Sequence, residues 1–398
     1  MKHTAPPDNF TRINTLDDTI VDAIHKFSPD TAIWLADMNR VRYCANLWEA
    51  YLPKIKAHYA MKCCDEPNLL KFLADHGFGF DCASKKEIEV ITQDLGVDAN
   101  RIVFSHPLKN KEAILYAKEV GVERMVFDTE EELRKILRFY PEAEVYLRVK
   151  PKFSNAKIPL SKKYGAPPED VPNLLQLASE LGANFIGFSF HVGSQCDDIN
   201  TFRQVFQYVA ELKVKAEELG LNVCFIDIGG GFYPPHAPAN NSFKEITETI
   251  NNAIDEFFGE NEIEFVGEPG RFFASEYMDL ILPVTCAKIH EDDHGERTQS
   301  IYIPDGIYGA FNSIIYDHNN PHFEIHTEGD SEKLPTTIWG QTCDSADIVY
   351  EDMMWPELEV GDLLIVRRFS AYTYSPTAFF NGFHHHPVVV LNKDEDDI

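Results

Sequence analysis

The sequence KAHYAMKCCDEP, at residues 56–67, gives the first indication of the fold. Its apolar residues predict a strand over residues 57–62, and Asp65-Glu66-Pro67 predicts a turn directly after that strand. Lys62 is therefore expected at the mouth of a strand. An amine that apolar neighbours partly desolvate there can attack a carbonyl, although most lysines at strand ends are simply solvated.

Seven further apolar runs alternate with helical patterns after this strand. The expected strands cover residues 78–82, 102–105, 125–128, 145–149, 185–191, 224–228 and 264–267. Patterns rich in Glu, Lys, Leu and Ala indicate helices between them, for example at residues 68–76 and 202–219. Eight such units predict an α/β fold, a (β/α)8 barrel of the TIM type, whose active site lies at the C-terminal ends of the strands.

The pattern changes after Arg271. Short β-rich runs at residues 281–284, 300–303, 336–339, 363–366 and 388–391 are separated by Gly, Pro and Asp turns. We therefore expect the barrel over residues 38–270 and a β-sandwich or β-barrel domain formed by residues 271–398 together with residues 1–37.

Composition excludes several classes of protein. The 398 residues are 44% hydrophobic and 25% charged, an ordinary globular mixture, and the formal net charge is -28. Such a surface repels nucleic acid and anionic membranes and attracts cationic small molecules. The eight cysteines show no CxxC spacing, no apolar run reaches 18 residues, and residues 1–7 lack a signal-peptide core, so a cytoplasmic protein is expected.

Two motifs at barrel strand ends suit a phosphorylated aromatic cofactor. Gly229-Gly230-Gly231 follows the strand at 224–228, and backbone N–H groups of consecutive glycines can approach a phosphate; a tight turn is the alternative. Glu268 ends the eighth strand before Pro269-Gly270-Arg271, where an acid can keep a pyridine nitrogen protonated. The dinucleotide fingerprint GxGxxG is absent.

Other polar residues near strand ends have both chemical and structural interpretations. His191 can stack on a flat cofactor, and Ser194 can reach a phosphate, but a core histidine is the commoner case. Asp81, Glu87 and Arg148 can surround Lys62, or they can form salt bridges between strands.

The β domain supplies a second group of candidates. The Cys343 thiol is a possible proton donor, and the carboxylates of Asp344 and Asp317 suit a cationic substrate tail. Aromatic residues accompany them at Tyr308, Tyr316, Tyr372 and Phe380. His384-His385-His386 predicts no metal site, because three adjacent histidines on a strand cannot all face one ion.

Taken together, the chain resembles the eukaryotic-type ornithine decarboxylases over about residues 25–392. The motifs YAMKC, FGFDCASKKEIE, SFHVGS, DIGGGF, GEPGRF, DGIYGAFN, YDH, IWGQTCDSAD and FFNGF occur in the order of that family. The family belongs to the alanine racemase-like, fold-type III enzymes that use pyridoxal 5'-phosphate (PLP). The resemblance implies a carboxy-lyase of polyamine biosynthesis that forms head-to-tail homodimers with composite active sites.

The resemblance also implies roles for individual residues. Lys62 would bind PLP covalently, Glu268 would hold the pyridine nitrogen, and His191 would stack on the ring. The phosphate would be lined by Ser194, Gly229, Gly230, Gly231, Gly270 and Arg271, with Tyr308 closing over it. The rest of the cofactor site would consist of Asp81, Glu87, Arg148 and Tyr372. Cys343 would be the catalytic proton donor from a second subunit, and the substrate would meet Tyr316, Asp317, Asp344 and Phe380.

The resemblance leaves several functions open. L-Ornithine is the first expected substrate, and L-lysine follows because one methylene discriminates by only about 1–3 kcal/mol. Diaminopimelate is less suitable, because its distal acid needs a cationic partner where this chain has Asp317. A non-catalytic regulatory relative would tend to lose Lys62 or the glycines, and both are present. An enzyme that binds NAD through its glycines is a further alternative.

Overall fold

The computed structural model describes residues 9–151, 163–193, 198–237, 242–259, 262–327 and 332–391. The chain divides into two compact units. The barrel unit comprises Tyr43–Lys62 and Pro67–Phe273, and the β unit comprises the described residues up to Arg42, Cys63–Glu66 and the described residues from Ala274 onward. The division differs by a few residues from the expected one, and it assigns the four residues after Lys62 to the β unit.

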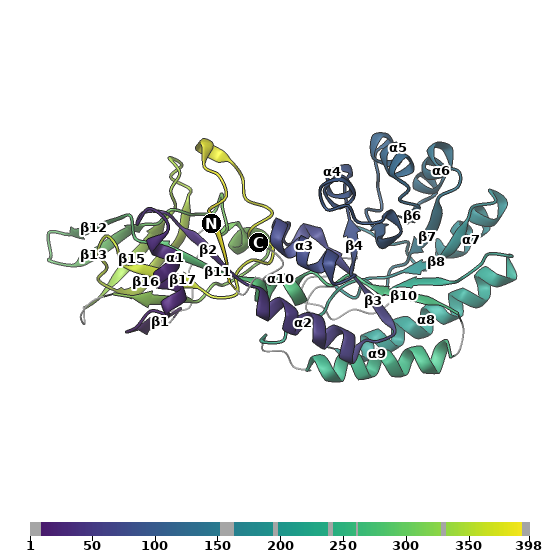
Figure 1. Cartoon of the computed structure of the whole chain (residues 1–398), viewed down its shortest axis with the longest axis horizontal. Helices are drawn as coiled ribbons and strands as arrows, with labels where there is room; N and C mark the ends of the chain where they lie inside the picture. Colours follow the sequence, from purple (N-terminus) through teal and green to yellow (C-terminus); the bar gives the residue numbers. More distant parts are fainter. Residues whose placement is uncertain are drawn as a thin grey trace. The chain divides into compact units, whose positions relative to one another are not determined.

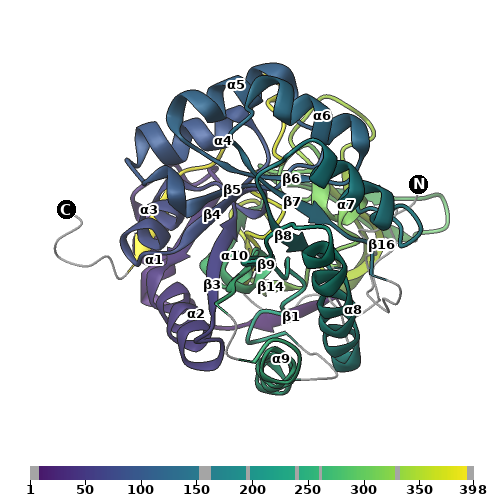
Figure 2. The ribbon, with the colours of Figure 1, turned by 90° about the vertical axis from the view of Figure 1, so that its right-hand side faces the viewer.

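The barrel unit contains a closed barrel of parallel strands in the order β10-β3-β4-β5-β6-β7-β8-β9. The strands are β3 (Ile55–Ala60), β4 (Gly79–Cys82), β5 (Ile102–Phe104), β6 (Arg124–Phe127), β7 (Glu144–Arg148), β8 (Phe185–Ser189), β9 (Phe225–Asp227) and β10 (Glu264–Gly267). The helices of this unit surround the ring of strands (Figure 2). They are α2 (Met38–Tyr51), α3 (Pro67–Asp75), α4 (Lys85–Glu89), α5 (Lys111–Val120), α6 (Glu130–Phe139), α7 (Val171–Glu180), α8 (Ile199–Glu218) and α9 (Phe243–Phe257). The predicted (β/α)8 fold is confirmed.

Apolar residues from successive strands fill the barrel. A buried cluster takes one residue from each strand from β5 to β10: Val103, Val126, Tyr146, Ile186, Phe225 and Val266. Such layers make the inside of a (β/α)8 barrel a packed core rather than a pore. The polar residues at the strand ends are therefore held on a rigid support.

Local sequence explains why the helices begin where they do. Helix α6 starts after Thr129, whose side chain accepts a hydrogen bond from the Glu132 N–H group and so caps the helix. Its first turn carries Glu130, Glu131 and Glu132, whose negative charges are favourable at a helix N-terminus.

The β unit contains two sheets. The larger sheet has the order β1-β14-β17-β11-β2-β18, and the smaller one has the order β12-β13-β15-β16. Their strands are β1 (Phe10–Ile13), β2 (Ile33–Asp37), β11 (Met278–Pro283), β12 (Cys286–Glu291), β13 (Arg297–Tyr302), β14 (Phe323–His326), β15 (Lys333–Trp339), β16 (Ile348–Pro356), β17 (Leu363–Val366) and β18 (Val388–Leu391) (Figure 1). The short helices α1 (Asp18–His25) and α11 (Asn312–Tyr316) accompany them.

The expected run at residues 281–284 belongs to β11, which starts three residues earlier, at Met278. Helix α10, at Arg271–Tyr277, precedes this strand. In the larger sheet, the side chain of Asp279 is only 1% exposed and accepts hydrogen bonds from the Arg40 and Arg367 side chains at 2.8 and 3.0 Å. These bonds hold the pKa of Asp279 below its usual value despite its burial.

No helix among the described residues is long and apolar enough to span a bilayer.

Candidate active site

Lys62 lies one turn beyond the strand that was expected to contain it. Strand β3 ends at Ala60, and Met61–Cys63 form a single turn of 3₁₀ helix. Ala60 is aligned with Asp81 of the neighbouring strand β4, and the Lys62 amine forms an ion pair with the Asp81 carboxylate. The Lys62 side chain is 46% exposed, whereas that of Asp81 is 1% exposed. The amine is thus accessible and lies against a buried carboxylate.

Two more buried carboxylic acids lie near this ion pair. Glu268 follows β10, and its Oε1 atom is buried without a hydrogen-bond partner among the described residues. Asp227 is the last residue of β9 and is 1% exposed. Burial raises the pKa of both acids; the charge of Asp81 raises that of Glu268 further, and the charge of Glu268 raises that of Asp227. Asp227 was not among the predicted site residues, although it ends an apolar run directly before Ile228 and the glycines.

The glycines form a tight turn against other backbone segments. Gly229 and Gly231 have positive φ angles of 65° and 107°, which favour glycine. A Cβ atom on Gly230 would lie 2.8 Å from the Glu268 carbonyl oxygen and 3.1 Å from His191 Nε2. Only glycine fits this turn, which leaves its backbone open to a close-lying anion. Gly270 and Arg271 follow Glu268 at the start of α10.

His191 is placed as a neutral ring near the same strand ends. Its Nδ1 atom accepts a hydrogen bond from the Gly193 N–H group at 2.9 Å. Desolvation and the charges of Arg148 and Lys62 lower the pKa of His191 well below its usual value. Arg148 is the last residue of β7. The imidazole is therefore uncharged and suited to stacking on a flat ring.

The remaining barrel candidates have a structural role or fall outside the description. The Glu87 side chain accepts a hydrogen bond from the Ala83 N–H group at 2.5 Å at the start of α4. Ser194 lies outside the described residues.

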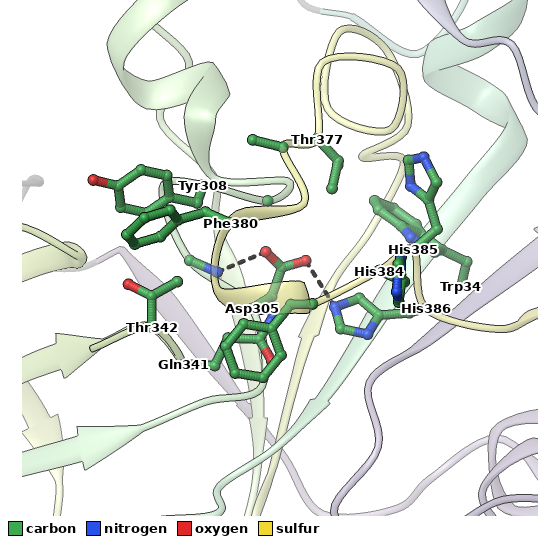
Figure 3. Close-up of a pocket in the computed structure, with 14 residues that line it drawn as sticks. Trp34, Asp305, Tyr308, Gln341, Thr342, Thr377, Phe380, His384, His385 and His386 are labelled. Carbon is green, nitrogen blue, oxygen red and sulfur yellow. Dashed lines mark hydrogen bonds and ion pairs between the residues drawn. The ribbon is translucent and has the colours of Figure 1, made fainter. Parts of the chain in front are cut away.

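In the β unit, four predicted residues gather in one place. The Asp344 carboxylate accepts a hydrogen bond from the Tyr308 hydroxyl at 2.5 Å. The Tyr308 ring stacks on Phe380, with centroids 4.7 Å apart (Figure 3). This hydrogen bond lowers the pKa of Asp344. Cys343 is exposed, and its N–H group donates to Oδ1 of Asn381 at 3.0 Å. Asn381 has a φ angle of 55° and stands inside the quoted FFNGF motif.

The other β-unit candidates lie in two other segments, at the end of α11 and in the loop at Tyr372. Tyr316 ends α11 and is 80% exposed, and Asp317 is the residue that caps this helix. Tyr372 has a φ angle of 56°, and its N–H group donates to the Cys63 carbonyl at 2.8 Å.

The histidine run is used for packing and for a polar contact. His385 stacks on Tyr374 with centroids 4.3 Å apart, and His386 contacts the Asp305 carboxylate at 3.2 Å (Figure 3). Within the described part of the chain, no three His, Cys, Asp or Glu side chains are grouped as a metal site.

The barrel residues fit a flat cofactor that carries an aldehyde and a phosphate. An accessible amine, a neutral imidazole and a glycine turn meet at the strand ends, and the open acceptor of Glu268 can bind a ring N–H group. A (β/α)8 barrel with this site and a separate β unit defines a class of PLP-dependent enzymes.

Comparison with known proteins identifies the family. The profile described as "Pyridoxal-dependent decarboxylase, pyridoxal binding domain" matches residues 38–275. Over 376 residues, the chain is 40% identical to an ornithine decarboxylase of Caenorhabditis elegans. The aligned region covers 92% of this chain and 88% of that protein. Over 381 residues, it is 36% identical to antizyme inhibitor 2 of Xenopus laevis. That alignment covers 93% of this chain and 83% of the relative.

The solved structure of a lysine decarboxylase from Selenomonas ruminantium superposes with a TM-score of 0.85 at 30% identity, covering 97% of this chain and 99% of that chain. The chain therefore belongs to the pyridoxal-dependent decarboxylases of fold type III, in the group of the eukaryotic-type ornithine decarboxylases. The family and the cofactor expected from the motifs are confirmed.

Proposed function

We propose that this protein decarboxylates L-ornithine to putrescine in polyamine biosynthesis and converts L-lysine to cadaverine less efficiently. The observation that carries the proposal is the intact constellation at the barrel mouth. There, Lys62 is paired with Asp81, and Glu268 keeps an open acceptor beside the glycine turn. The ornithine decarboxylase and lysine decarboxylase among its relatives support the choice of substrates.

The barrel residues bind and orient the reacting groups. Bound PLP supplies an aldehyde for the substrate amine and a ring that accepts the electrons released when CO2 leaves. Asp81 could take a proton from Lys62 so that the amine becomes nucleophilic, and Glu268 would accept the ring N–H hydrogen bond and favour the electron-poor ring. The glycine turn would hold the phosphate, and His191 would cover the ring. Orientation of the reacting groups by such contacts can be worth about 7–11 kcal/mol.

The β unit supplies the proton donor and the substrate contacts. The exposed Cys343 thiol can return a proton to Cα after CO2 has left. Asp344 and Asp317 can hold the distal ammonium of ornithine, while Tyr316 and Phe380 line its aliphatic part. We propose that these residues enter the site of a second subunit in a head-to-tail homodimer, as the family resemblance implies.

A cytoplasmic location without nucleic-acid or membrane partners completes the proposal. The seven described cysteines are free thiols, and four of them are buried: Cys44, Cys63, Cys64 and Cys82. The net charge of -28 favours cationic substrates over polyanions.

The test is to incubate the purified protein and PLP with ornithine, lysine, arginine and diaminopimelate, and to measure CO2 and amine. We expect the highest kcat/KM with ornithine and a value about 10–200-fold lower with lysine, because one methylene separates them. Lys62→Ala should abolish the absorbance of covalently bound PLP as well as CO2 release. Full PLP occupancy without CO2 from any of the four amino acids would contradict the proposal.

That negative outcome would favour a non-catalytic regulator, the class suggested by the similarity to antizyme inhibitor 2. Diaminopimelate as the best substrate would instead move the activity to another decarboxylase of the same fold. Asp317→Ala separates these cases, because loss of a distal-ammonium partner should raise KM for ornithine without weakening PLP retention.

A further inference from the structure

Asp227 is a buried acid that has no role in the proposed function. It ends β9 and is 1% exposed, and its Oδ1 atom accepts a hydrogen bond from the Gly229 N–H group at 2.8 Å. Strand β9 pairs with β10, where Val266 is aligned with Asp227, and Glu268 follows Val266 by two positions, level with Gly229. A backbone hydrogen bond also connects the two segments: the Glu268 N–H group donates to the Gly229 carbonyl at 2.7 Å.

The carboxyl groups of Asp227 and Glu268 are close enough that each shifts the pKa of the other. A hydrogen bond between two carboxyl groups requires one proton, and two adjacent buried carboxylates could not both remain charged. The proton belongs with the acid that is harder to ionise. Burial and Glu268 raise the pKa of Asp227 well above its usual value, whereas the neighbouring Lys62 opposes the rise for Glu268.

We infer that Asp227 is a protonated positioning residue that donates to Glu268, keeps that side chain as the carboxylate, and directs its free Oε1 atom to the cofactor ring. Through its second contact, to the Gly229 N–H group, the same side chain fixes the glycine turn. Asp227 thereby sets the distance between the ring-nitrogen contact and the phosphate contact. The inference rests on the proposed function as a PLP-dependent decarboxylase.

The other charged and titratable groups near this pair are consistent with that arrangement. Asp81 and Lys62 lie on the Glu268 side, where they form their own ion pair. Tyr146 lies near both acids, and burial raises its pKa well above the usual value, so it stays neutral. Ser105 also lies near Glu268 and lowers the pKa of that carboxyl group, which favours the charge there.

Two substitutions of Asp227 separate its contacts from its charge. Asp227→Ala removes both contacts and is expected to lower kcat at saturating PLP by about 10–100-fold, as is typical for residues that orient an essential ligand. In Asp227→Asn the amide oxygen can accept from Gly229, and the amide N–H can donate to Glu268 without any proton being shared. Asn should therefore recover most of the lost PLP affinity and kcat. If Asn were as damaging as Ala, Asp227 would be the charged partner, and the inference would be wrong.

A double-substitution cycle tests whether Asp227 acts through Glu268. Fluorescence titration with PLP gives the dissociation constant of wild type, Asp227→Ala, Glu268→Ala and the double variant. We expect Asp227→Ala to weaken binding more than tenfold in wild type and by less than about threefold in the Glu268→Ala protein. Losses that simply add would mean that Asp227 only supports the turn.

Asp128 is a matched control. It follows the barrel strand β6, and its carboxylate likewise accepts a hydrogen bond from a glycine N–H group, that of Gly165, at 2.8 Å. Asp128→Ala should lower the melting temperature but leave unchanged the pH at which the absorbance band of bound PLP changes. Asp227→Ala should shift that pH. A shift of equal size in both variants would refute the inference. Wild-type protein that binds PLP but releases no CO2 would refute the proposed function alone, because the cycle is measured on PLP affinity.

Discussion

His58 is predicted to make the barrel unit sensitive to acid. It lies on β3 opposite Gly79, is 3% exposed, and neither ring nitrogen has a hydrogen-bond partner among the described residues. A Cβ atom on Gly79 would lie 2.5 Å from the imidazole, so the ring occupies the space that a side chain at position 79 would need. Desolvation, together with the positive charge of Arg124, lowers the pKa of His58 to about 4.

The sign and size of the effect follow from this value. The folded-state pKa is below the unfolded-state value of about 6.5, so the unfolded chain binds a proton first as the pH falls. The penalty is absent above about pH 7, grows through pH 6 and 5, and levels off below about pH 4. A difference of about 2.5 in pKa corresponds to about 3 kcal/mol at the plateau and to about 2 kcal/mol at pH 5.

His58→Phe keeps a flat ring of similar size and removes both the titration and the two unpartnered nitrogens. Urea unfolding of both proteins between pH 5 and pH 8 would give the free energy of unfolding of each. We expect the variant to gain about 2 kcal/mol relative to wild type when the pH falls from 7.5 to 5. His290→Gln, at an exposed position on β12, controls for the loss of a histidine as such. A difference between His58→Phe and wild type that does not change with pH would refute the reasoning.

Three more predictions follow from other parts of the molecule. Gly230→Ala should weaken PLP binding more than about tenfold, because its Cβ would lie 2.8 Å from the Glu268 carbonyl; PLP titration with unchanged affinity would show that the turn does not hold the phosphate. Glu132→Gln should lower the free energy of unfolding in urea by about 3–5 kcal/mol, because Lys109 is fully buried beside it at 3.0 Å and would become an unpaired charge. Lys135, the partly exposed partner of the same carboxylate, provides the control as Lys135→Gln. An equal loss of free energy in that variant would contradict the role of burial. Mixing Lys62→Ala and Cys343→Ala subunits should restore up to about a quarter of the activity, because one site of each hybrid dimer is intact; no recovery despite proven exchange would exclude composite sites.

The barrel could be predicted because its signals are local. Each strand is an apolar run of a few residues, and each helix between strands has its own periodic face and cap, as Thr129 does for α6. The glycine turn and Glu268 could also be predicted, since both follow apolar runs immediately. Lys62 was placed one turn too early, because the apolar residues Ala60 and Met61 continue the strand pattern into a 3₁₀ turn.

What sequence reasoning missed depends on contacts between distant residues. Asp227 ends an apolar run like many loop acids, and its role becomes visible only when β10 brings Glu268 near it. The segment Cys63–Glu66 belongs to the β unit because Glu66, which is 2% exposed, accepts a hydrogen bond at 2.5 Å from the hydroxyl of Tyr277, 211 positions later. The sheet order β1-β14-β17-β11-β2-β18 joins the two ends of the chain in the same way, and no local pattern encodes it.

The three-glycine turn restricts how the gene for this protein can drift. At Gly229, Gly230 and Gly231 an added methyl group would come within 2.4, 2.8 and 2.7 Å of the carbonyl oxygens of Phe190, Glu268 and Gly193, respectively. These obstacles are backbone atoms from two different segments, residues 190–193 and Glu268, so no single repacked side chain can relieve them. Every missense change of a glycine codon introduces a Cβ atom. Three consecutive codons can therefore accept only synonymous changes, whatever amino acid the enzyme evolves to use as its substrate.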